Sequence, residues 1–300
     1  MDPAINTTLQ TANGWLTLPA SLKRPDGAPR FNLHFPLYFL SDPGATHLIA
    51  HETNTGYEPP TRDLIERTLR RGDLFVDVGA HWGFFALQAA THPAGEIEVV
   101  AFEPELMNAT ILSENVARNN CANLAVVCAA CGDQSKLVPL IANSTMRHCI
   151  HGADTRFDGR TPSKWVPVVA LDGAIGDLPK QAERRIIIKI DAEGFEPNII
   201  AGAKSLLKSG RVALIVWECG EAFAAGGRQD AMAHMVGFLS ECGFRHLRPA
   251  ADGADSPLIA FDAEATYNGN VFSYAPQLNE QQIFDGPPLA ARDVRVAIAG

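Results

Sequence analysis

The segment from Val76 to Gly83, with the sequence VDVGAHWG, constrains the fold of this chain more than any other. Its apolar residues predict a buried strand, and Gly79 and Gly83 allow the backbone that follows to come close to a ligand. A helix is expected to begin at Phe84. Backbone N–H groups left free at the start of that helix could hold polar or anionic parts of a nucleotide-like ligand. The segment thus predicts a strand, a ligand-binding turn and a helix.

The glycine spacing and Asp77 narrow the kind of ligand. A dinucleotide site favours three glycines spaced GxGxxG, whereas this turn has the spacing GxxxG. The Asp77 carboxylate would repel a phosphate but suits a cationic or hydroxyl-bearing ligand. We therefore expect S-adenosylmethionine, which is positively charged and lacks phosphate, with contacts from Asp77, Gly79, Ala80 and Gly83. Taken alone, the two glycines would equally fit an ordinary turn between a strand and a helix.

Three further apolar runs each end in a residue suited to the same ligand. Ile97 to Phe102 is followed by Glu103, which lies 26 residues after Asp77 and could bind ribose hydroxyls. The run from Leu124 to Ala130 leads to Asp133, a candidate acceptor for an adenine amino group. A fourth strand, Ile186 to Ile190, places Asp191 at its tip. Because parallel strands end at one edge of a sheet, we expect cofactor contacts from Glu103, Pro104, Cys131, Gly132, Asp133 and Asp191.

Several motifs in this order resemble the FkbM-type methyltransferases. They are GYEP (56–59), GDLFVDVGAHWGFF (72–85), FEPE (102–105), VPVVALD (166–172), KIDAEGFE (189–196), the Gly202-Ala203 pair and Trp217-Glu218. The resemblance covers roughly residues 56–220, about half the chain. It implies a class I S-adenosylmethionine-dependent methyltransferase fold and, in most characterised members, O-methylation. The chain departs from the family pattern at His81-Trp82 and at Ala192, near the expected methionine end of the cofactor.

The expected architecture is an α/β, Rossmann-like class I methyltransferase fold. It has a mostly parallel seven-stranded sheet with helices on both faces and an N-terminal β-hairpin appendage. Alternating apolar residues from Phe31 to Phe39 predict the first hairpin strand, and His47 to His51 the returning strand. We expect an N-terminal extension (1–56), a methyltransferase domain (57–275) with a substrate-loop insertion at about 134–184, and a C-terminal tail (276–300).

Transfer of a methyl group to a hydroxyl requires removal of the hydroxyl proton, which favours a nearby base. Asp191 is the first candidate, because the fourth strand tip is expected to face the transferred methyl, and Glu193 is the second. Asp191 could equally serve only to order the turn before Pro197. His151, like His148, could act as a base if the long insertion folds over the site. Glu58 is a candidate contact for the amino-acid end of the cofactor.

The composition of the chain argues against nucleic-acid binding, membrane association and a metal site. A net charge of −9 and an isoelectric point near 5.5 argue against a broad basic surface for nucleic acid. The first residues lack a basic start with an apolar core, and no apolar run approaches the roughly 18 residues that span a bilayer. These features predict a cytoplasmic location and no membrane partner. The pair Cys128 and Cys131 matches C-x-x-C but falls within one predicted strand, so we expect no metal site there.

The leading hypothesis is an S-adenosylmethionine-dependent methyltransferase that methylates a hydroxyl of a sugar or secondary metabolite. Its expected partners are a small-molecule or glycan acceptor and, through the N-terminal hairpin, a second copy of the chain in a homodimer. A non-catalytic cofactor-binding or scaffold protein with the same fold is the alternative. A nicotinamide oxidoreductase is disfavoured, because the chain lacks both GxGxxG and a Tyr-x-x-x-Lys pair.

Overall fold

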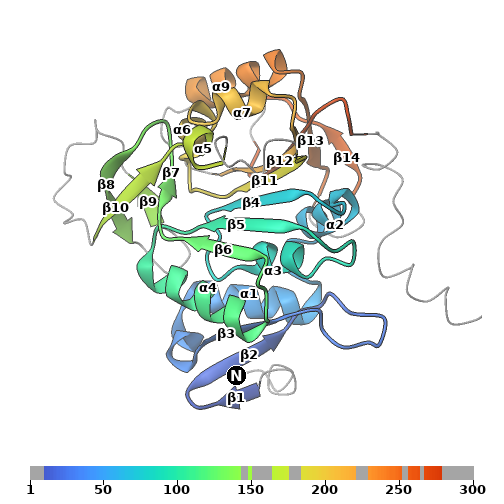
Figure 1. Cartoon of the computed structure of the whole chain (residues 1–300), viewed down its shortest axis with the longest axis vertical. Helices are drawn as coiled ribbons and strands as arrows, with labels where there is room; N and C mark the ends of the chain where they lie inside the picture. Colours follow the sequence, from blue (N-terminus) through green and yellow to red (C-terminus); the bar gives the residue numbers. More distant parts are fainter. Residues whose placement is uncertain are drawn as a thin grey trace, which may run out of the picture.

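The computed structural model describes residues 10–142, 148–150, 164–175, 184–220, 229–251, 256–263 and 267–278. An eight-stranded main sheet forms its centre, in the order β14-β13-β15-β12-β11-β4-β5-β6 (Figure 1). Its strands are β4 (Leu74–Val78), β5 (Glu98–Phe102), β6 (Leu124–Val127), β11 (Ile186–Ile190), β12 (Val212–Cys219), β13 (Arg245–Pro249), β14 (Leu258–Ala260) and β15 (Gly269–Tyr274).

Five neighbouring strands of this sheet, from β12 to β6, are parallel, and β15 runs antiparallel to both β12 and β13. The predicted mostly parallel sheet is therefore confirmed. The predicted number of seven strands is wrong for the described residues, because the short strand β14 pairs with β13 at the edge. Along the sequence, β5 and β6 are added on one side of β4, and β11 and β12 are added on its other side. The strand order thus reverses between β4 and β11, where sheets of this kind bind ligands.

Helices cover both faces of the main sheet, as expected. One face carries α2 (Pro59–Thr68), α3 (Phe84–Ala90) and α4 (Leu106–Arg118); the other carries α5 (Leu171–Ile175), α6 (Glu196–Ala201), α7 (Lys204–Lys208) and α9 (Gln229–Glu241) (Figure 1). The two-residue period of a strand divides β4 between two hydrophobic cores. Phe75 packs in the core with α3, whereas Val76 packs in the core with α6 and α9.

The N-terminal segment is a three-stranded antiparallel sheet followed by two helices. Its elements are β1 (Gln10–Ala12), β2 (Trp15–Pro19), β3 (Asn32–Pro36), the short 3₁₀ helix η2 (Leu37–Ser41) and α1 (Pro43–Asn54). An antiparallel sheet is thus present, but the predicted returning strand His47 to His51 is wrong, because these residues belong to α1. The side chain of Asp42 accepts hydrogen bonds from Gly44 N and Ala45 N, at 2.9 and 3.2 Å, and so starts a helix just before the residues of the expected strand.

A second small sheet, in the order β7-β10-β8-β9, lies beside the main sheet (Figure 1). Its strands are β7 (Ala130–Cys131), β8 (Lys136–Ala142), β9 (His148–Ile150) and β10 (Lys164–Val169). The predicted single strand from Leu124 to Ala130 is wrong, because β6 ends at Val127 and the chain then crosses to this second sheet. Cys128 and Cys131 consequently do not share a strand and cannot be assigned to its two faces. Much of the expected substrate insertion, including His151, lies outside the described residues.

Candidate active site

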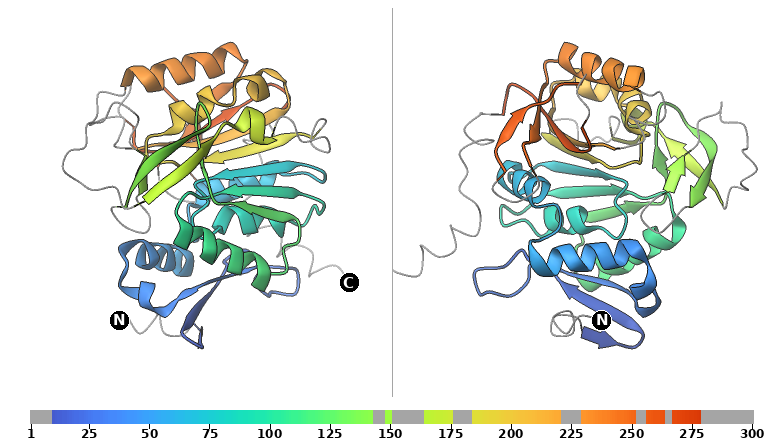
Figure 2. Two further views of the ribbon diagram at one scale, coloured as in Figure 1. Left: turned by 60° about the vertical axis from the view of Figure 1, so that its left-hand side comes forward. Right: turned by 180° about the vertical axis from the view of Figure 1, so that it is seen from behind.

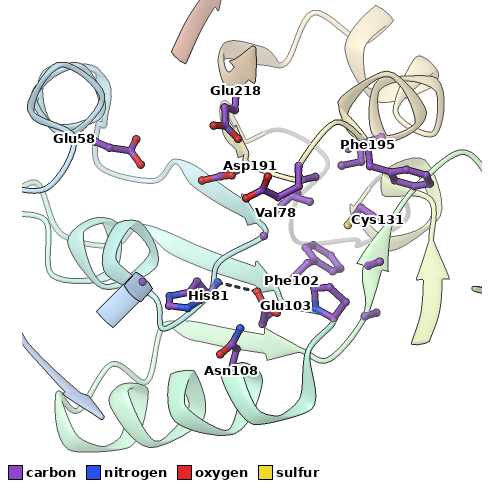
Figure 3. A pocket seen from close by; sticks show the side chains of 18 of the residues that line it. Glu58, Val78, His81, Phe102, Glu103, Asn108, Cys131, Asp191, Phe195 and Glu218 are labelled. Carbon is purple, nitrogen blue, oxygen red and sulfur yellow. Dashed lines mark hydrogen bonds between the residues drawn. The ribbon is translucent and has the colours of Figure 1, made fainter. Parts of the chain in front are cut away.

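A cavity of about 560 Å³ opens at the carboxyl ends of β4, β5, β11 and β12, where the strand order reverses (Figure 3). The first turn of α1 also contributes to its wall, through Pro43, Gly44 and His47. The other lining residues are Tyr57, Glu58, Val78, Gly79, His81, Phe102, Glu103, Pro104, Asn108, Ala129, Ala130, Cys131, Asp191, Ala192, Glu193, Phe195, Ile199 and Glu218. The cavity therefore brings together residues from most of the motifs that the sequence singled out.

Gly79 lets the turn after β4 approach the tip of β11. Its φ is +79°, and a Cβ atom on this residue would lie 1.8 Å from the carbonyl oxygen of Asp191. Gly83 acts differently, because its φ is +91° and a Cβ there would lie 2.2 Å from Leu112 Cδ1. Gly83 thus permits α3 to pack against α4 and does not line the cavity. Ala80 borders a smaller adjacent cavity of about 30 Å³.

The expected free N–H groups of this turn are already hydrogen-bonded. Gly79 N and Ala80 N donate to the carbonyl oxygen of Phe102, at 2.9 and 3.0 Å, and Gly83 N donates to Ala80 O at 2.8 Å. His81 N donates to Glu103 Oε2 at 2.9 Å. These four N–H groups are therefore not among the free donors that were expected at the start of the helix. They instead join the turn to the end of β5 and fix the position of Glu103.

Glu103 is buried at the tip of β5. Each of its two carboxylate oxygens accepts a hydrogen bond from a different backbone N–H group. Oε2 accepts from His81 N, and Oε1 accepts from Glu105 N, both at 2.9 Å. Burial outweighs these bonds and raises the pKa of Glu103 to about 8. The side chain of Asn108 also hydrogen-bonds this carboxyl group, which leaves it able to accept a further hydrogen bond from a ligand hydroxyl group in the cavity. Its position suits the predicted ribose contact.

A group of ionisable side chains lies where β11 and β12 end. Lys189 Nζ is 3.0 Å from Asp191 Oδ2 and 4.7 Å from the centre of the Phe85 ring. Glu58 Oε2 accepts a hydrogen bond from Asn270 Nδ2 at 2.7 Å, and the carboxyl group of Glu218 lies close enough to Asp191 for each to affect the pKa of the other. Lys189 holds the pKa of Asp191 below its usual value despite burial, whereas the neighbouring Asp191 charge and burial raise the pKa of Glu218 to about 9. This end of the cavity is therefore strongly polar and mostly acidic.

Some functional candidates in this group were not predicted from the sequence. Lys189 interrupts a run of isoleucines in β11, a strand whose five residues are all buried. A lysine in such a strand is rarely buried without a charged partner, so it was a detectable signal. Glu218 also ends an apolar run, in the same manner as Glu103 and Asp191. Asn270 carried no comparable signal, because only the antiparallel pairing of β15 with β12 brings it to the site.

Asp77 is buried beneath the cavity floor and does not line the large cavity. Neither of its carboxylate oxygens has a partner of ordinary hydrogen-bond geometry within the described part of the chain, although the backbone N–H of Ala86 is close enough to lower its pKa. It borders the smaller cavity together with Lys189 and lies opposite Lys189 in the pairing of β4 with β11. Burial raises the pKa of Asp77 to about 6, although the Lys189 charge acts against this rise. A buried carboxylate with incomplete hydrogen bonding can be satisfied by a water molecule or by a donor group of a ligand.

The other predicted contacts divide into those that reach the cavity and those that do not. Pro104, Cys131, Glu58, Glu193 and Asp191 line it. Asp133 instead pairs with Lys136 at 3.0 Å and is not a lining residue, so the structure places no adenine contact there. Gly132 serves packing, because a Cβ would lie 2.7 Å from Val168 Cγ1. The side chains around the predicted adenine end are largely apolar and include Phe102 and Cys131.

Three of the six non-glycine residues with positive φ in the described part of the chain lie at this site. Glu58, His81 and Glu193 have φ values of 41°, 50° and 51°, in the left-handed region that non-glycine residues rarely adopt. All three line the cavity. Such strain persists only where the surrounding structure enforces it, and it concentrates at functional sites. The strained residues thus support the cavity as the functional centre.

The strand order and the cavity at its reversal define an α/β protein of the class I methyltransferase type. Residues 77–246 match the model of the methyltransferase FkbM domain, and the chain belongs to this family. Membership makes it a methyltransferase whose cofactor is S-adenosylmethionine. No curated protein matches the chain.

Solved structures that resemble this chain are distant. Methyltransferase FkbM from Methylobacillus flagellatus KT is 17% identical over 69% of this chain, with a TM-score of 0.44, and the match spans 45% of that protein. Cofactor-bound Rv0187 from MTB is 13% identical over 78% of this chain and 90% of its own, with a TM-score of 0.44. Precorrin-6y C5,15-methyltransferase from Geobacter metallireducens GS-15 is 13% identical over 72% and 87%, with a TM-score of 0.38.

Two kinds of feature are absent from the described residues. No helix among them has the length and apolar character needed to cross a membrane. Within the same ranges, no group of three or more histidine, cysteine, aspartate or glutamate side chains is placed to hold a metal ion.

Proposed function

We propose that this protein methylates a hydroxyl group of a sugar or other small metabolite, with the cofactor in the 560 Å³ cavity. The observation that carries the proposal is Glu103, a buried carboxyl group at the tip of β5 that lines this cavity and is held there by two backbone donors. A carboxylate in this position is suited to two adjacent ribose hydroxyls. The apolar surface around Phe102 and Cys131 is suited to a flat adenine ring, as Figure 3 illustrates.

The acidic end of the cavity suits the other half of the cofactor. When bound, S-adenosylmethionine supplies a methyl group on positively charged sulfur, which needs little further activation. Glu58, Asp191 and Glu218 would stabilise positive charge at this end. Asp191 is also suited to accept the proton of an acceptor hydroxyl, because Lys189 keeps its carboxylate ionised. Roles for Glu193 and His151 stay predictions, as does a homodimer formed through the N-terminal segment.

The first test is binding of S-adenosylhomocysteine, the demethylated product, measured by titration calorimetry. We expect micromolar binding by the wild type and a loss of about 2–3 kcal/mol, or roughly 30- to 150-fold, in Glu103→Ala, because hydrogen bonds between the ribose and a buried carboxyl group disappear. Glu114→Ala removes an exposed carboxylate on α4 and should bind as the wild type does.

A folded wild type that fails to bind would overturn the proposed cofactor site. Equal affinity of Glu103→Ala and wild type would instead show that the ribose is held elsewhere. Once binding is established, acceptors can be screened by following methyl transfer. Paired compounds that differ only in hydroxyl or amino group at one position would test the preference for oxygen.

A further inference from the structure

Exposed apolar side chains from two elements meet beside the cavity. They are Leu37 and Tyr38 of η2 and Leu106 and Met107 of α4, whose exposed fractions are 43, 63, 63 and 47%. The Tyr38 hydroxyl oxygen lies 3.9 Å from Met107 Sδ, which brings the two pairs together. Single exposed apolar residues are ordinary on a protein surface, whereas a group of them indicates a binding surface. These four residues are called the apolar rim below.

The apolar rim is continuous with the wall of the cavity. η2 leads into α1, whose first residues Pro43 and Gly44 line the cavity. Pro104 and Asn108, which flank the rim residues of α4 in sequence, line it as well. A ligand that extends out of the cavity between α1 and α4 therefore meets the apolar rim.

Trp82 holds the two halves of the rim in place from below. Its ring lies 5.3 Å from the ring of Phe39, which is buried and lies 4.5 Å from the Tyr38 ring. Its indole N–H donates to Asn108 Oδ1, in the first turn of α4, at 3.1 Å. Both η2 and α4 are thus anchored to one buried side chain. The rim is a positioned surface, as a binding site requires.

The charge of the cavity limits the part of an acceptor that can enter it. Carboxyl side chains line the cavity at Glu58, Glu103, Asp191, Glu193 and Glu218. Within the described part of the chain, its lining includes neither an arginine nor a lysine. Phosphate or carboxylate groups of an acceptor would be repelled by the acidic end and would find no cation to pair with. The cavity therefore favours an uncharged head group.

We propose that the methyl acceptor is an amphiphile, with an uncharged hydroxyl-bearing head group that enters the cavity and an alkyl chain that lies on the apolar rim. This inference rests on the proposed function and narrows its substrate class. A free sugar would leave the rim uncovered. A second copy of the chain is a poorer occupant, because a stable dimer buries about 800 Å² on each partner, more than four side chains supply.

NMR of isotope-labelled methionine methyl groups tests the rim without knowledge of the natural acceptor. The probes are methyl, hexyl, heptyl and octyl β-D-glucoside, added below their micelle-forming concentrations to the protein with S-adenosylhomocysteine bound. We expect octyl glucoside to shift the Met107 signal to saturation. Affinity should rise roughly two- to fourfold with each added methylene group, because each leaves water on binding. Methyl glucoside should not shift the signal.

The other methionines provide an internal reference. Met232 and Met235 of α9 are 4% and 3% exposed and lie in the core on the other face of the sheet, so their signals should not move. Met107→Leu assigns the Met107 signal by removing it. Octyl sulfate carries the same chain on an anionic head group and should bind about tenfold more weakly, because carboxylates line the cavity.

Substitutions in the rim locate the binding surface. Tyr38→Ser should weaken binding of octyl glucoside by about fivefold or more, because apolar contact area is lost while Met107 still reports binding. Leu106→Ser should act in the same way and covers the case in which Tyr38→Ser does not fold. Ile259→Ser is the matched control, since Ile259 is 39% exposed on β14 at the far edge of the main sheet. This control should bind octyl glucoside as the wild type does.

Several results would overturn the inference. They are an affinity independent of chain length, equal affinity for octyl sulfate, or wild-type affinity in the folded rim variants. Loss of a dimer in Tyr38→Ser, measured by sedimentation, with unaltered glucoside binding would assign the rim to a second copy. A wild type that binds S-adenosylhomocysteine but shows no shift with octyl glucoside contradicts this inference alone. Failure to bind S-adenosylhomocysteine contradicts the proposed function instead.

Discussion

At the scale of single residues, the site depends on a few positions where side-chain size or charge is critical. Gly79 permits contact between the turn after β4 and the tip of β11, because only a hydrogen atom fits against the Asp191 carbonyl oxygen. Lys189 is buried and lies among Glu58, Asp77 and Asp191. A buried cation of this kind compensates nearby carboxylates and thereby sets which of them is ionised. Small changes at these positions should alter the site more than the fold.

Replacing Gly79 by alanine should damage both stability and binding. The left-handed conformation costs a non-glycine residue about 1–2 kcal/mol, and the new methyl group would also push β4 and β11 apart. We expect a clear fall in melting temperature and at least a tenfold weaker affinity for S-adenosylhomocysteine. Gly95→Ala is the matched control, since Gly95 has a φ of +69° and no atom within 4 Å of its Cβ position. If both variants bound equally well, close approach at Gly79 would not matter.

At the scale of elements, the N-terminal segment is built into the enzyme and does not merely extend from it. Leu16 and Phe35 from its sheet share one hydrophobic core with Phe84 of α3. Figure 2 shows α1 between this small sheet and the main sheet. Because the first turn of α1 also lines the cavity, the position of the N-terminal segment affects the shape of the site.

A buried ion pair anchors this segment. Arg30 pairs with Glu66 of α2 and donates to the carbonyl oxygen of Gln88 in α3 at 2.7 Å, and both charged side chains are at most 5% exposed. Removing one partner leaves the other charge buried and unpaired. Arg30→Met should therefore lower the free energy of unfolding by roughly 3–5 kcal/mol. Arg71→Met breaks the exposed Arg71–Glu96 pair and should change it very little. Urea denaturation of the two variants measures the difference, and similar losses would argue against this anchor.

At the scale of the whole molecule, the cluster of buried acids links stability to pH. Burial raises the pKa of Asp77 to about 6, of Glu196 to about 7 and of Glu103 to about 8. The charge of Asp191, together with burial, raises the pKa of Glu218 to about 9. In the unfolded chain these groups would ionise near their ordinary values. The folded protein therefore holds more protons than the unfolded chain across this range of pH, and its stability must fall as the pH rises.

The melting temperature of the cofactor-free protein should accordingly decrease between pH 6.5 and 9. Burial lowers the pKa of His246 to about 4, so this side chain has the opposite effect below this window. The unfolded chain binds a proton at this histidine more readily than the folded protein does, and the folded protein is therefore destabilised as the pH falls. Thermal unfolding followed at several pH values measures the slope. The double variant Glu103→Gln with Glu218→Gln should show a shallower slope than the wild type. A wild-type melting temperature that is constant or rises across the window would show that these acids are already ionised.

The sequence alone determined the class of fold and several of the residues that line the cavity. Local patterns sufficed for this, because a buried strand followed by a glycine turn or an acidic residue marks a strand tip wherever the strand pairs. Glu103 and Asp191 were found in this way, and both line the cavity. The same local patterns failed for His47 to His51, where the Asp42 cap converts an expected strand into a helix.

Only the tertiary structure decided which strand tips meet and what charge each group carries. Asp133 ends an apolar run as Glu103 does, yet the chain leaves the main sheet after Val127 and pairs Asp133 with Lys136. Asn270 is far from Glu58 in sequence but bonds it at 2.7 Å through the pairing of β15 with β12. Hydrogen bonding and ionisation depend on distances and burial between segments that are remote in sequence, so a local pattern of residues does not encode them.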